Sequence, residues 1–74
     1  MMHTFKLITN NEPAVLERLL RVTRHRGFTL QMMKVTASND QLAINFTVDS
    51  LRPVNRLFNQ LEKLYDVKTI EILE

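Results

Sequence analysis

The sequence predicts an α+β domain with the element order βαββαβ, in which two helices cover one face of a four-stranded antiparallel sheet. In four segments apolar residues alternate with polar ones, which is the period of a half-buried strand. In two other segments apolar residues recur every three or four positions, as in an amphipathic helix. The only glycine, Gly27, separates the first helical segment from the second strand, where a helix end is expected.

The first strand is expected over residues 4–9, with Phe5 and Leu7 facing the core. Residues 10–13 (NNEP) are of types that favour a turn and a helix start, and Asn11 is the expected N-cap of the first helix. The helix then covers residues 14–26 and ends in three basic side chains that suit the negative end of its dipole, Arg24, His25 and Arg26.

The second strand follows Gly27 over residues 28–37, and its alternation changes phase near Gln31 and Met32. A shift of one residue turns every side chain to the opposite face, so a β-bulge is expected there. After a turn at residues 38–40, residues 41–49 form the most regular strand, with one apolar and one polar face.

A second helix is expected to start at residues 50–53 and to end at Asp66, and residues 67–73 form the last strand. Its apolar stripe consists of Val54, Leu57, Phe58, Leu61 and Leu64. Right-handed crossovers then give the ferredoxin-like strand order 4-1-3-2, with both helices on the apolar face and strands 2 and 4 at the edges.

The second strand is the edge expected to pair with another copy of the chain. Its residues include a single formal charge, and an apolar edge without protective charges favours strand pairing. The expected dimer edge consists of Leu30, Met32, Met33 and Lys34.

Size and composition predict one domain over residues 1–74 that associates with a partner. A chain of 74 residues buries a small core, and this one has no cysteine for disulfides and no His/Asp/Glu cluster for a metal. No apolar run approaches the roughly 20 residues of a membrane span, and the N-terminus lacks signal-peptide order. We therefore expect no membrane association and a cytoplasmic location.

The net charge of +2 does not indicate nucleic acid. An RNA-recognition domain of this topology stacks bases on outward aromatic residues of its third strand, where this chain has Ala43, Asn45 and Thr47. The basic residues gather on the first helix. They are either a solvated face or a docking surface for an acidic protein, with candidates Arg18, Arg21 and His25.

Catalysis by this chain is not expected. It has no cysteine nucleophile and no glycine-rich phosphate loop, and the loop over residues 10–13 lacks the arginine of a small acylphosphatase-like hydrolase. His25 is interpreted as a partner of the helix dipole rather than as a general base. The acidic side chains near the C-terminus, Glu62, Asp66, Glu71 and Glu74, are predicted to be solvated.

Residues 16–28 (LERLLRVTRHRGF) resemble the small regulatory subunits of acetolactate synthase (acetohydroxyacid synthase), in particular isozyme II of enteric bacteria. The similarity continues over residues 58–67 (FNQLEKLYDV) and covers nearly the whole chain, with the first of these segments the more specific. The resemblance implies an ACT domain, which has the βαββαβ fold. It also implies a non-catalytic role in branched-chain amino-acid biosynthesis, in which the small subunit binds and activates a large catalytic subunit.

The resemblance places thiamine diphosphate, magnesium and FAD on that catalytic subunit and no cofactor on this chain. It also implies an effector site between two copies, formed by the first loop and the start of the second strand. Valine-sensing relatives have Asn and, three residues on, Gly in that loop, and a second Asn after the Gly-aromatic pair. The candidate effector residues, which we expect to be vestigial, are Asn11, Glu12, Pro13, Ala14, Phe28 and Thr29.

Asn11 is kept, but Ala14 and Thr29 stand where those relatives have Gly and the second Asn. The Ala14 methyl crowds a close backbone approach, and Thr29 offers one hydroxyl in place of an amide. The resemblance thus implies weak valine binding or none. Two alternatives stay open: a free-standing ACT-type amino-acid sensor and a small enzyme of this fold. The surface for the catalytic subunit is either the basic side of the first helix or the polar sheet face.

Overall fold

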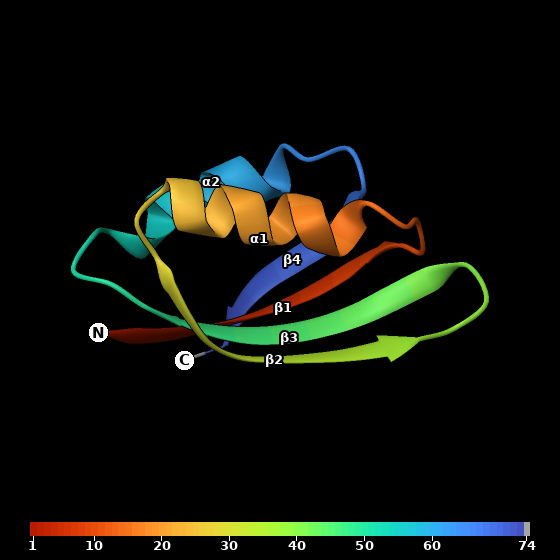
Figure 1. The fold of residues 1–74 in the computed structure, drawn as a ribbon, viewed down its shortest axis with the longest axis horizontal. Helices are drawn as coiled ribbons and strands as arrows, with labels where there is room; N and C mark the ends of the chain where they lie inside the picture. The colour runs from red at the N-terminus through yellow and green to blue at the C-terminus, as the bar shows by residue number, and fades with distance from the viewer. Residues whose placement is uncertain (74) are drawn as a thin grey trace.

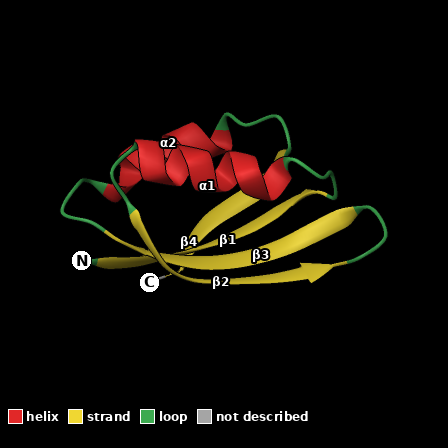
Figure 2. Cartoon of the chain, in the orientation of Figure 1, coloured by secondary structure: helices red, strands yellow, loops and turns green. Residues whose placement is uncertain are grey.

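The computed structural model describes residues 1–73 and confirms the predicted βαββαβ order (Figure 1; Figure 2). Glu74, predicted to be solvated, lies outside the described residues. The elements are β1 (Met2–Asn10), α1 (Val15–His25), β2 (Thr29–Ala37), β3 (Gln41–Asp49), α2 (Val54–Glu62) and β4 (Val67–Leu73).

The four strands form one antiparallel sheet in the order β2-β3-β1-β4, which is the predicted order read from the other edge. Both helices lie on the same face of this sheet, and no element among residues 1–73 covers the opposite face (Figure 1). The strands β2 and β4 are the two edges, as predicted.

The core lies between the helices and the covered sheet face. Its centre is the cross-strand pair Phe5 and Phe46, whose rings are stacked with centroids 5.2 Å apart. Both rings are fully buried, and a stacked aromatic pair stabilises the fold beyond the contribution of its buried apolar area. The other buried apolar residues are Leu7, Val15, Leu19, Phe28, Leu42, Ile44, Val48, Leu57 and Leu61.

The predicted irregularity in β2 is confirmed. The register with β3 shifts between Leu30 and Met32, so Gln31 is the extra residue of the bulge. A second shift, between Ile8 and Thr9 in the pairing of β1 with β4, was not expected from the sequence. The β2 bulge keeps Leu30 and Met33 on the helix-covered side of the sheet despite the change of phase.

Gly27 ends α1 in a Schellman motif. Its φ is 82°, its N–H donates to the Arg24 carbonyl, and the Phe28 N–H donates to the Thr23 carbonyl. No other residue among those described has a positive φ. The helix end predicted at the only glycine is therefore confirmed, and Gly27 has the left-handed conformation that this motif requires.

Two details of the helix ends were predicted wrongly. Asn11 does not cap α1, because the helix starts later, with Ala14 at the N-cap and no side-chain cap. Likewise, α2 ends at Glu62 rather than at Asp66, and a turn connects it to β4. Asp66 is also not solvated: it is only 2% exposed, since it packs under α1 and contacts Arg18.

Candidate functional site

The candidate effector residues lie at opposite ends of α1 within one chain. The loop over residues 11–14 precedes the helix, and Phe28 and Thr29 follow it. An 11-residue helix is about 16 Å long, so one chain cannot close a small-ligand site from both groups. The family resemblance implied a site between two copies of the chain, and that placement stays a prediction.

Asn11 ties the first loop to the β2–β3 hairpin. Its side-chain amide donates to the Ser38 carbonyl at 3.1 Å, and its backbone N–H donates to the Asp40 carbonyl at 3.1 Å. The loop therefore lies beside the C-terminal end of β2, whereas Thr29 begins that strand. Phe28 belongs to the core, 4% exposed, and its ring packs inward rather than toward a ligand.

The three partner-binding candidates on α1 have different surroundings. Arg18 contacts the buried Asp66, with its Nε 3.0 Å from Oδ2. This is a charge contact without an aligned hydrogen bond, since neither Asp66 carboxylate oxygen has a hydrogen-bond donor among residues 1–73. Arg21 and His25 are exposed. Sequence reasoning treated the three as one face, and the structure separates Arg18 from it.

The β2 edge exposes apolar side chains. Leu30, Met32 and Val35 are 38%, 56% and 37% exposed, and Lys34 is also exposed, whereas Met33 is half-buried. Leu20 of α1 is 39% exposed and lines an apolar depression together with Phe28 and Leu30. The apolar surface thus continues from the strand edge onto the neighbouring helix.

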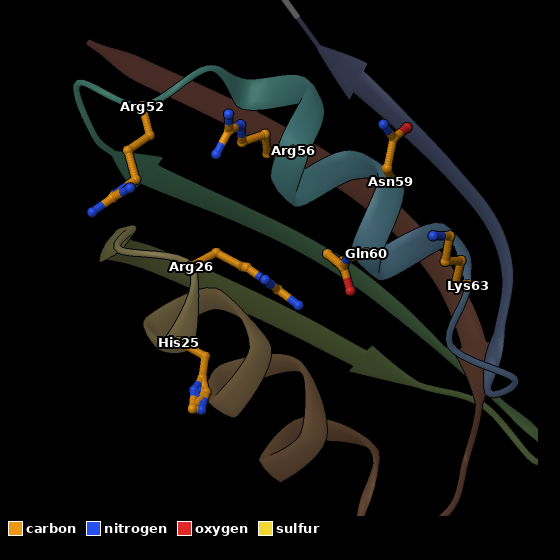
Figure 3. A pocket seen from close by; sticks show the side chains of 7 residues that line it. All are labelled: His25, Arg26, Arg52, Arg56, Asn59, Gln60 and Lys63. Carbon is orange, nitrogen blue, oxygen red and sulfur yellow. The ribbon is translucent and has the colours of Figure 1, made fainter.

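A basic groove of about 430 Å³ runs between the C-terminal end of α1 and the outer side of α2 (Figure 3). In Figure 3 the Arg26 guanidinium extends from the end of α1 toward Gln60 of α2, and His25 points away from α2. The lining residues of this basic groove are His25, Arg26, Arg52, Arg56, Asn59, Gln60 and Lys63.

Sequence reasoning missed most of this groove. It identified the basic end of α1, but Arg52, Arg56 and Lys63 come from a segment some 30 residues later. The available signal was the spacing of Arg52, Arg56 and Lys63 on the polar side of the second helical pattern. Without the packing angle of the helices, that spacing does not show which element the side chains approach.

A hydrogen-bonded turn holds the start of α2 against the end of α1. Ser50 Oγ donates to the Gly27 carbonyl at 3.2 Å and accepts from the Arg52 N–H at 2.9 Å. The Arg52 side chain covers Gly27 so closely that a Cβ there would lie 2.4 Å from Arg52 Nε. The only glycine therefore leaves the space that this arginine occupies.

At the other end of that turn, the Met1 ammonium donates to Asp49 Oδ1 at 2.8 Å. This hydrogen bond, with the attraction of the positive charge, lowers the pKa of the Asp49 carboxyl below its ordinary value of 3.8. Among residues 1–73 no three His, Asp or Glu side chains gather as metal ligands. No helix in the described part of the chain is long and apolar enough to cross a membrane.

Comparison with known proteins identifies the fold. A family model described as the ACT domain matches residues 11–70. The ACT domain of GTP pyrophosphokinase from Chlorobium tepidum superposes with a TM-score of 0.85 over 99% of this chain and 97% of that one, at 13% identity. The acetolactate synthase small subunit from Thermotoga maritima has a TM-score of 0.83, at 17% identity, over 100% of this chain and 48% of that one. Fold and family model together define an ACT domain.

Sequence similarity is more specific. The chain is 43% identical over 76 aligned residues to the acetolactate synthase isozyme 2 small subunit of Escherichia coli K12 and to that of Shigella flexneri. The alignment covers all of this chain and 87% of each relative. The chain therefore belongs to the acetolactate synthase small subunits with an ACT domain, which are regulatory and not catalytic.

Proposed function

We propose that this chain, as one ACT domain over residues 1–74, binds and activates the large catalytic subunit of acetolactate synthase. The observation that carries the proposal is the 43% identity over the full chain to the isozyme 2 small subunits. The reaction belongs to branched-chain amino-acid biosynthesis in the cytoplasm. Thiamine diphosphate, magnesium and FAD are assigned to the catalytic subunit, and no cofactor to this chain.

We further propose that the chain forms a homodimer through β2. The exposed apolar residues of that edge support it, because an edge strand with one formal charge is poorly protected against pairing. Leu20 extends this surface onto α1, so a second copy would cover helix and strand together. A two-fold antiparallel pairing brings the start of β2 in one copy near the end of β2 in the other.

That pairing supports an effector site shared by two copies. Thr29 of one copy would approach the Ser38 end of β2 in the other, where Asn11 is anchored. We propose that this effector site binds valine weakly or not at all. Asn11 already donates one amide N–H to Ser38, Ala14 carries a methyl, and Thr29 lacks an amide. The enzyme carrying this subunit would accordingly be insensitive to valine.

Reconstitution tests the proposed function. Acetolactate formation by the purified catalytic subunit is measured with increasing amounts of this chain, and the two are tested for copurification. We expect the rate to rise to a plateau and the two chains to copurify. An unchanged rate without copurification contradicts the proposal, and amino-acid binding by the chain alone would then favour a free-standing ACT-type sensor.

A further inference from the structure

We propose that the basic groove between α1 and α2 receives an acidic segment of the catalytic subunit. This inference rests on the proposed function and assigns the contact to a surface. The sequence left two candidates, the basic side of the first helix and the polar sheet face. The groove is a third surface, which shares His25 with the first candidate.

The charges in the groove are not neutralised by other residues of the described part of the chain, 1–73. Four lining residues are Arg or Lys, one is His, two are amides, and none is acidic. Among residues 1–73 none of these basic side chains forms an ion pair, whereas Arg18 pairs with Asp66 and the Met1 ammonium with Asp49. Like charges that converge in a concave surface create a positive potential that attracts an anionic partner.

The stability of the fold does not explain where two of these cations, Arg52 and Arg56, lie. The N-terminal end of a helix is the positive end of its dipole and favours acidic side chains. In α2, Arg52 precedes the helix and Arg56 lies in its first turn, which has no acidic residue. Each cation there opposes the helix dipole, so its placement indicates a role outside folding.

The groove is also partly preorganised. The Ser50 hydroxyl ties the backbone of Arg52 to the end of α1, and the missing side chain of Gly27 leaves room for the arginine. An arginine whose backbone is already held loses less conformational entropy on binding. The same turn therefore shapes the groove wall that α2 contributes.

The spread of the charges favours an acidic protein segment. Arg56 and Lys63 are seven residues apart, about 10 Å along the helix axis, so the cations of α2 are spread along the groove. An extended peptide advances about 3.3 Å per residue, so its acidic side chains can follow the groove. Sites for single-stranded nucleic acid use aromatic side chains on which the bases stack, and no aromatic ring of Phe, Tyr or Trp lines this groove.

A charge-matched pair of variants tests the proposal on the complex with the catalytic subunit. Arg52→Gln/Arg56→Gln removes two charges from the groove, and Lys6→Gln/Lys68→Gln removes two from exposed positions on β1 and β4. The Kd of each complex is taken from activation curves at several salt concentrations. We expect the groove pair to raise Kd about tenfold or more and to flatten its salt dependence. The control pair should leave both unchanged.

A second groove pair, Arg26→Gln/Lys63→Gln, gives the same test without altering the turn at Ser50, and thermal melting confirms that each variant is folded. Unchanged Kd in both groove pairs, or an equal loss in the control pair, overturns the proposal while the proposed function stands. A loss confined to the control pair assigns the contact to the sheet. The same variants are tested for binding to a single-stranded RNA oligonucleotide. If the groove pairs lower RNA binding and leave the Kd for the catalytic subunit unchanged, the groove is a nucleic-acid site and the proposal is overturned. If the unmodified chain fails to bind the catalytic subunit, the proposed function fails as well.

Discussion

Arg18 Nε lies 3.0 Å from the Oδ2 atom of Asp66, and this contact joins α1 to the turn before β4. The Asp66 side chain is 4% exposed and the Arg18 side chain 40%. The backbone carbonyl of Asp66 accepts the Asn10 N–H at 2.9 Å, so the same residue also binds the end of β1. Three elements thus meet at one buried residue, α1 at its carboxylate and β1 at its backbone carbonyl.

Replacing Arg18 by Gln is expected to destabilise the chain by about 1–3 kcal/mol, because it leaves the buried Asp66 carboxylate without its cation. For a domain of this size, at about 4–8 °C per kcal/mol, that corresponds to a melting temperature lower by roughly 4–24 °C. Urea denaturation at one fixed protein concentration measures the change. Charge reversal at Arg18 would consequently alter the fold and cannot test partner binding alone.

The double-mutant cycle with Asp66→Asn is the control. A neutral amide at position 66 has no charge to compensate, so Arg18→Gln should cost less in that background. Equal costs in both backgrounds would show that the contact adds no coupling energy.

The sequence pattern was sufficient for the topology and insufficient for this contact. In β3 and α2 one side of the element is buried, and this one-sided burial produces a periodic pattern of apolar residues. That pattern can be detected in the sequence alone. Asp66 comes after a helical pattern, and from the sequence its carboxylate is expected at the surface. Its burial results from the packing of the turn after α2 against α1, which the local sequence does not show. The groove was missed for the same reason: the approach of Arg52 to Gly27 is a long-range contact.

Gly27→Val is expected to lower stability by more than ~1 kcal/mol, since a β-branched residue at φ 82° is strained. It would also displace Arg52, whose flexible side chain can move aside at small cost. Thermal melting measures the total loss, and the same substitution made together with Arg52→Ala separates the two effects. Most of the loss should persist in the Arg52→Ala background. An unchanged melting temperature in the single variant would rule out backbone strain as its main effect.

The pH dependence at Asp49 follows from its contact with the Met1 ammonium. Because its pKa is lowered in the folded chain, the carboxylate contributes stability above its ordinary value of 3.8 and loses it as pH falls through the folded value. The stability difference between the unmodified chain and Asp49→Asn should therefore be constant at neutral pH and should shrink below pH 3.8. Carboxyl NMR titration checks the cause: N-terminal acetylation should return the Asp49 pKa toward the ordinary value. A titration that acetylation leaves unmoved contradicts this origin.

The β2 edge is tested by Met32→Lys, with Leu73→Lys on the β4 edge as the matched control. Both residues are exposed apolar side chains on edge strands, 56% and 42% exposed. A lysine on β2 would oppose pairing through charge repulsion between the copies, beside the existing Lys34. Sedimentation velocity should show a dimer for the unmodified chain and for Leu73→Lys, and a monomer for Met32→Lys. A dimer in all three would assign the interface elsewhere.

The proposed effector site is tested by restoring the two residues of the valine-sensing pattern, Ala14→Gly and Thr29→Asn. Glycine removes the methyl that crowds a backbone approach, and asparagine supplies both a donor and an acceptor to the ligand. An unpaired ligand group costs about 1–3 kcal/mol, so the double variant should bind valine about tenfold more tightly or better. Calorimetry on the dimer measures both proteins, and Asn11→Ala in the double variant should abolish the gain. A micromolar or lower Kd for the unmodified chain would show instead that Ala14 and Thr29 already permit valine binding.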